Sequence, residues 1–166
     1  WASHIDSATG RPVMTDVADY RDEPQFTLPS MVGAHNWHPM AYHPEYQLMY
    51  IPMIEQGFEF KANDEFANEG TLHTGVAMSM GRADPLLFKA VQKATHIGSI
   101  VAWDPITQTE RWRIDFDKPW SMSLLATAGN LLFQGSHDGW LKAYRADTGE
   151  QVWQSLTQIA AIAPPV

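Results

Sequence analysis

Two stretches of the chain alternate small or apolar residues with polar ones, as half-buried β-strands do. The first covers residues 98–112 and the second residues 139–153. In each stretch the alternating residues run into turn-forming residues, and a second run follows that ends in Trp. The pattern predicts two β-hairpins, each with a large aromatic residue in its returning strand.

The two stretches align without a gap at an offset of 41 residues. A fixed period near forty residues is typical of repeat folds with one supersecondary unit per period. A Trp that recurs once per unit can fill the seam between neighbouring units. The alternative is a coincidental pair of hairpins, which an ungapped register over fifteen positions disfavours. The matched pairs are Gly98 and Gly139, Ala102 and Ala143, Thr107 and Thr148, and Trp112 and Trp153.

Outside these two stretches, some segments repeat the hairpin pattern and others do not. Residues 1–14 hold a third, partial copy, in which Asp6 and Thr9 repeat the turn chemistry of Asp104 and Thr107. Residues 15–30 are expected to form a loop, and residues 41–52 a strand, a turn and a buried strand. Residues 55–95 are interpreted as an insertion that includes a short helix near 86–93. Residues 120–153 are predicted to supply four strands, which would make one complete blade.

The predicted fold class is all-β, with β-propeller blades of four antiparallel strands. Residues 1–166 are interpreted as one partial propeller with repeat units at 1–14, 98–112 and 139–153. Propellers contain about four to eight blades. The chain could therefore form a minimal ring, but its ends favour an arc of a larger propeller.

Composition narrows the functional classes. A net charge of −8 disfavours a nucleic-acid partner, and no apolar run approaches the length of a membrane span. The chain has no Cys, which excludes disulfides, thiolate metal sites and a covalent c-type haem within this segment.

The densest candidate chemistry lies in residues 33–40, where two His, an Asn and a Trp fall within eight positions. The amide of Asn36 offers a donor and an acceptor, and Trp37 offers a flat apolar face, so the pair suits a planar ligand with polar edges. One alternative is a metal site at His35, His38 and His43, although their spacing does not place them on one helix face. Another is that Trp37 only fills a seam and Asn36 only forms a turn.

An ordered string of motifs gives the chain a family resemblance. The string consists of residues 33–40, 50–52, 102–105, 125–135 and 138–139. It resembles the C-terminal part of the propeller of the quinoprotein alcohol dehydrogenases, which depend on pyrroloquinoline quinone, and it is most similar to their quinohaemoprotein branch.

The resemblance implies an eight-bladed propeller joined by Trp-containing docking motifs, with the quinone on the axis beside Ca²⁺ or, in some relatives, a lanthanide. It implies a periplasmic enzyme that oxidises a primary alcohol to an aldehyde by hydride transfer to the quinone. Electrons would then pass to a cytochrome or to an attached domain that holds haem c. The remaining blades of the propeller would be further partners of this segment.

Three residues match the family's cofactor surroundings. Asn36 and Trp37 match its quinone-contacting pair, and Trp120 precedes a strand that the family places near the cofactor. The family's catalytic base and metal ligands lie upstream of this segment, so no catalytic residue or metal ligand is assigned here. Met122 and Ser123 stand where the family commonly has two Gly. That departure suits the alternative function, a non-catalytic propeller scaffold for protein–protein assembly.

Overall fold

The computed structural model describes residues 1–63, 75–76, 98–118 and 121–161. It divides into one unit of residues 1–31 and 57–94 and a second unit of residues 32–56 and 95–166. The predicted helix near 86–93 and the candidate Trp120 lie outside the described residues.

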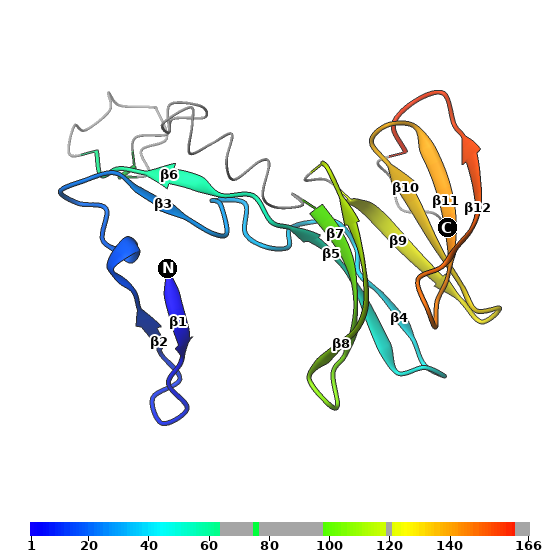
Figure 1. Cartoon of the computed structure of the whole chain (residues 1–166), viewed down its shortest axis with the longest axis horizontal. Coiled ribbons are helices and arrows are strands. Elements are labelled where there is room, and N and C mark those ends of the chain that lie inside the picture. Colours follow the sequence, from blue (N-terminus) through cyan, green and yellow to red (C-terminus); the bar gives the residue numbers. More distant parts are fainter. Residues whose placement is uncertain (64–74, 77–97, 119–120, 162–166) are drawn as a thin grey trace. The chain divides into compact units, whose positions relative to one another are not determined.

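The first unit consists of short elements (Figure 1). A hairpin of β1 (Ala2–Ile5) and β2 (Pro12–Met14) leads to a 3₁₀ turn, η1 (Asp16–Ala18). Strand β3 (Gln25–Thr27) then pairs antiparallel with β6 (Phe58–Phe60). The sequence analysis expected a loop at 15–30 and an insertion at 55–95, and it did not predict η1, β3 or β6. Each has only three residues, which is too short to show a periodic pattern.

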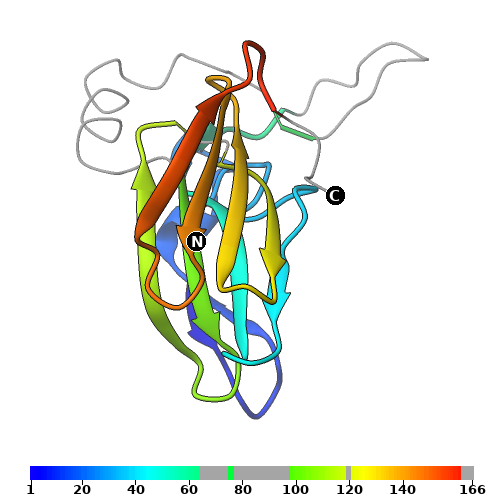
Figure 2. The same cartoon turned by 90° about the vertical axis from the view of Figure 1, so that its right-hand side faces the viewer.

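The second unit contains two four-stranded antiparallel sheets, which are seen in Figure 2 with the second sheet in yellow to red. The first sheet has the order β4 (Ala41–His43), β5 (Leu48–Ile54), β7 (Gly98–Asp104) and β8 (Thr109–Phe116). The second has the order β9 (Ser121–Thr127), β10 (Leu131–Ser136), β11 (Trp140–Arg145) and β12 (Gln151–Leu156). The all-β class and the four-stranded antiparallel sheets are confirmed, and the four strands predicted for 120–153 are observed between Ser121 and Leu156.

The core of this unit lies between the two sheets. Trp112 on β8 stacks on Tyr50 of β5 with ring centroids 5.5 Å apart. The indole Nε1–H of Trp112 donates to the carbonyl oxygen of Ala146 at 3.1 Å, and the Tyr50 hydroxyl donates to the same oxygen at 2.9 Å. Trp112 therefore fills the seam, as predicted. The buried residues around it are Leu48, Ile100, Ala102, Leu124, Leu132 and Tyr144.

Trp153 occupies the position in the second sheet that Trp112 occupies in the first, but its surroundings differ. It pairs with Ala143, which pairs with Phe133, just as Trp112 pairs with Ala102 and Ala102 with Tyr50. Within the described residues Trp153 is 47% exposed. Its cross-strand neighbour Ala143 is buried, but the core cluster of this unit contains Leu132 and Tyr144, which alternate along their strands with Phe133 and Ala143.

The three predicted repeat turns share one backbone conformation at their fifth residue. Gly10, Gln108 and Gly149 all have positive φ, at 68°, 56° and 75°. In the first and third turns the N–H of that Gly donates to the carbonyl four residues earlier, at 2.8 and 2.9 Å. The middle turn keeps this conformation with Gln, although Gly is the residue that adopts positive φ at least cost.

Candidate functional site

The candidate site is a loop of residues 32–38 that precedes β4. Gly33 bends the chain with a φ of +79°, and a Cβ there would lie 3.2 Å from the carbonyl oxygen of His35. Both the left-handed backbone and the close approach favour Gly at this position. The bend turns the following residues back toward the end of β5.

Two hydrogen bonds attach this loop to β5. The N–H of Ile54 donates to the carbonyl oxygen of Ala34 at 2.8 Å. The Nδ1 of His35 lies 2.8 Å from the carbonyl oxygen of Pro52. Because a carbonyl oxygen only accepts, Nδ1 must carry the hydrogen. The loop is therefore fixed at two neighbouring points, both immediately before Asn36.

The side chain of Asn36 braces the loop. Its Nδ2 donates to the carbonyl oxygen of Val32 at 2.7 Å, and its Oδ1 accepts the backbone N–H of Trp37 at 2.8 Å. These contacts use one of the two amide hydrogens and one of the two lone pairs of the oxygen. Asn36 is exposed, so the remaining donor and acceptor are open to a ligand.

Trp37 presents one face of its indole to the exterior. The ring is 62% exposed and stacks on the imidazole of His38 at 4.1 Å between centroids, with 25° between the planes. His38 itself is only 3% exposed. Burial, assisted by the nearby charge of His35, lowers the pKa of His38. A buried imidazole therefore packs against one face of Trp37, and among the described residues the rest of the indole is largely exposed.

The three histidines of the alternative metal site, His35, His38 and His43, each contact other groups of the protein. Within the described residues, no three His, Asp or Glu side chains gather closely enough to hold a metal ion. His35 is occupied by the carbonyl of Pro52, and His38 by the indole of Trp37. His43 is buried on β4 and stacks on Tyr46 at 4.5 Å.

The residues of the loop fit the ligand type that the sequence suggested. One exposed indole face and one free amide edge, on adjacent residues of a tethered loop, suit a planar group with polar edges. The sequence analysis found Asn36 and Trp37 but treated His35 and His38 only as rival metal ligands. Their actual contacts with Pro52 and Trp37 leave no periodic signal in the sequence.

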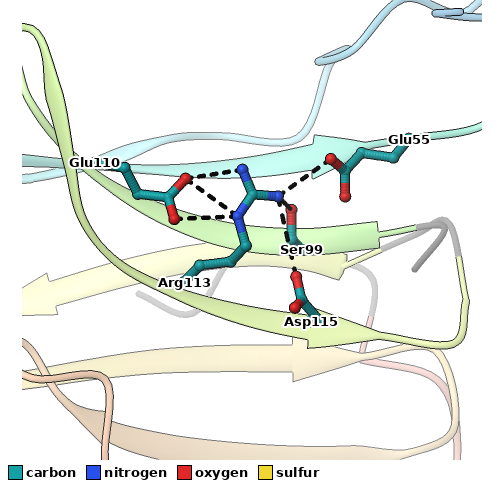
Figure 3. Close-up of polar contacts among 5 residues, drawn as sticks. All are labelled: Glu55, Ser99, Glu110, Arg113 and Asp115. Carbon is teal, nitrogen blue, oxygen red and sulfur yellow. Dashed lines mark hydrogen bonds and ion pairs between the residues drawn. The ribbon is translucent and has the colours of Figure 1, made fainter. Parts of the chain in front are cut away.

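A second polar cluster surrounds Arg113 on β8 (Figure 3). Its guanidinium donates to Glu110 at 2.8 Å, to Glu55 at 3.1 Å and to the hydroxyl of Ser99 at 3.1 Å. A third carboxylate, Asp115, lies 3.9 Å away. These partners come from β7, β8 and the residue that follows β5. Arg113 therefore links three neighbouring segments and balances three acidic side chains, which is a structural role.

We expect Arg113→Met to lower the free energy of unfolding by about 1–2 kcal/mol, because the three carboxylates would lose their shared cation. Urea denaturation measures this change. The matched control is Arg21→Met. Arg21 pairs with Asp19 and its side chain is 80% exposed, so we expect this change to leave the free energy of unfolding the same within error. Equal changes in the two variants would show that the Arg113 cluster adds no more than a surface ion pair.

Two general observations complete the description of the chain. Among the residues that the structure describes, no helix is long and apolar enough to cross a membrane. The sequence matches no family model.

Individual relatives, in contrast, match over the full chain. The chain is 38% identical over 167 residues to quinohemoprotein alcohol dehydrogenase ADH IIB from Pseudomonas putida, covering 100% of the chain and 23% of the relative. It is 35% identical over 176 residues to the quinohemoprotein alcohol dehydrogenase of Comamonas testosteroni, covering 99% of the chain and 23% of the relative. It is 36% identical over 168 residues to lupanine 17-hydroxylase [cytochrome c] from a Pseudomonas species, covering 99% of the chain and 23% of that relative.

Solved structures agree with these relatives. The crystal structure of the Comamonas testosteroni quinohemoprotein alcohol dehydrogenase matches with a TM-score of 0.84 and 30% identity, over 99% of this chain and 25% of the other. A europium-containing methanol dehydrogenase matches with a TM-score of 0.80 at 23% identity, over 100% of this chain and 28% of the other, and shows the fold alone. The chain spans about a quarter of the length of the relatives it matches. By sequence over its whole length and by fold, the chain is homologous to one segment of the quinoprotein and quinohaemoprotein alcohol dehydrogenases.

Proposed function

We propose that the protein containing this chain is a dehydrogenase that oxidises a primary alcohol to an aldehyde with pyrroloquinoline quinone as the hydride acceptor. Within it, this segment contributes Asn36 and Trp37 to the quinone pocket. The observation that carries the proposal is the exposed indole face of Trp37, held beside the open amide edge of Asn36 on a tethered loop. The names of the relatives support the same class of enzyme.

The residues of the segment would bind and orient the quinone, and no catalytic base is assigned among them. The exposed face of Trp37 would lie against the flat ring system, since aromatic rings prefer stacked or edge contacts. The second amide hydrogen of Asn36 would donate to a polar edge of the ring. Trp120 stays a further candidate for the same pocket. The bound quinone would supply the two-electron acceptor, and Ca²⁺ or a lanthanide would be held by residues outside this segment.

Electron transfer and location belong to the same proposal. The quinohemoprotein names, and the cytochrome c in the name of the lupanine enzyme, support an electron acceptor that carries haem c. We propose a periplasmic location for the whole protein on the basis of the family resemblance. The name of the lupanine enzyme also indicates that substrates vary among relatives, so we propose a substrate class and no individual alcohol.

A second role of the segment is to pack blades together. The two sheets bury a common core and share the carbonyl of Ala146 as an acceptor for Tyr50 and Trp112. The exposed Trp153 would make the corresponding contact with one of the remaining blades of the propeller.

Replacing Trp37 by Ala in the full-length protein should weaken binding of pyrroloquinoline quinone by about tenfold or more, because a stacking surface is lost. Equilibrium dialysis gives the dissociation constant without depending on Trp fluorescence. Trp37→Phe keeps a flat ring and should retain most of the affinity. Asn36→Ala should also weaken binding, both through a lost hydrogen bond and through a loosened loop.

The alternative function is a non-catalytic propeller scaffold for protein–protein assembly. It is favoured if the unmodified full-length protein binds no quinone in the presence of Ca²⁺ or a lanthanide. Quinone binding that is unaffected by Trp37→Ala and Asn36→Ala would leave the enzyme class standing and remove these two residues from the pocket.

A further inference from the structure

Strand β5 is longer than β4, the strand beside it on one edge, and continues to Ile54 past the last residue that pairs with β4. Strand β4 pairs with β5 only from Ala41 opposite Tyr50 to His43 opposite Leu48. Residues two apart on a strand direct their backbone groups to the same side. The backbone groups of Pro52 and Ile54 therefore point to the same side of β5 as those of Tyr50. The pairing with β4 starts only at Tyr50, so β4 does not lie beside Pro52 and Ile54. Their outward backbone groups need other partners.

The loop of residues 32–38 supplies those partners. The N–H of Ile54 bonds to Ala34, as a strand neighbour would. Pro52 has no N–H, so its only outward group is the carbonyl, and this carbonyl receives the Nδ1–H of His35 at 2.8 Å. An imidazole thus takes the place of a backbone donor. The hydrogen on Nδ1 is present in the cation as well as in this neutral tautomer, so protonation of His35 leaves the bond in place.

We propose that His35 is a positioning residue of the quinone pocket, which fixes Asn36 and Trp37 through its Nδ1 hydrogen bond to Pro52. This inference rests on the proposed function. The bond belongs to the residue immediately before Asn36, and it lies beside the backbone bond that joins Ala34 to Ile54 of β5. Without it, Trp37 could shift or rotate relative to the ligand, and such small displacements weaken binding and productive geometry.

The test compares three variants of the full-length protein at one position. His35→Asn places an amide Nδ2 close to where Nδ1 was, so it can still donate to Pro52. His35→Gln carries its amide one carbon further out, near the former Nε2, and His35→Leu has no donor. We expect His35→Leu and His35→Gln to raise the dissociation constant for pyrroloquinoline quinone about fivefold, the equivalent of one lost hydrogen bond. His35→Asn should stay within about twofold of the unmodified protein.

Two further readouts separate positioning from general stability. The circular dichroism of the bound quinone reports its surroundings and should change in His35→Leu but return in His35→Asn. Thermal unfolding of the quinone-free variants controls for loss of fold. Equal loss of affinity in all three variants, or unchanged affinity in His35→Leu, overturns the positioning role. If Trp37→Ala also leaves affinity unchanged, then the proposed pocket itself fails; if Trp37→Ala weakens binding while His35→Leu does not, only the role of His35 fails.

Discussion

Replacing Trp112 by Ala should lower the free energy of unfolding by about 3–5 kcal/mol, the range for deleting a large aromatic side chain from a core. Trp112 packs between two sheets, stacks on Tyr50 and donates to the carbonyl of Ala146. Its removal would leave a cavity at the seam, and the sheets would lose contact along one edge. Urea denaturation followed by far-UV circular dichroism measures the change. A loss below about 1 kcal/mol, the level of a surface substitution, would contradict the assignment of Trp112 as the main seam residue.

The shared acceptor at Ala146 gives this prediction an internal control. Trp112→Phe and Tyr50→Phe each remove one donor and leave the other on the same carbonyl. We expect each single change to cost about 1 kcal/mol or less, since the carbonyl stays satisfied. The double variant should cost more than the sum, because the buried carbonyl then has neither donor. Strict additivity would show that the two bonds act independently.

Much of the second unit could be predicted from the sequence because it repeats. The matched positions around Trp112 and Trp153 fixed the two hairpins, and the apolar runs after residue 120 fixed the other strands of the second sheet. The repeat could not show that the two Trp would differ in exposure. Exposure depends on whether another sheet covers the residue, and the sequence pattern is the same in the two stretches whether or not a sheet covers them.

The parts that sequence analysis missed share a physical reason. Strands β3 and β6 are three residues each and pair across a long separation in sequence, so neither alternation nor a turn reveals them. The contact of His35 with Pro52 joins a side chain in an irregular loop to a backbone carbonyl, and the Arg113 cluster collects charges from positions 55, 110 and 115. Such contacts are set by the packed fold and leave no local pattern.

Replacing Gly149 by Ala should cost about 2–4 kcal/mol, because two penalties fall on the same residue. Its φ of +75° disfavours any side chain, and a Cβ there would lie 2.8 Å from Cε3 of Trp112. Gly10 is the matched control. It holds the fifth position of the corresponding turn with a φ of +68°, but a Cβ there would have no neighbour within 4 Å. Gly10→Ala should therefore cost only the backbone part, about 1 kcal/mol.

The difference in unfolding free energy between Gly149→Ala and Gly10→Ala measures the contact of Gly149 with Trp112. Gln108 already shows that a side chain is tolerated in this turn, at a φ of 56°. The excess cost at Gly149 must then come from Trp112, and it should largely disappear when Gly149→Ala is introduced together with Trp112→Ala. Persistence of the full cost in that double variant would assign it to the backbone alone. Disappearance would show that Gly149 is required because the indole of the neighbouring sheet lies directly against it.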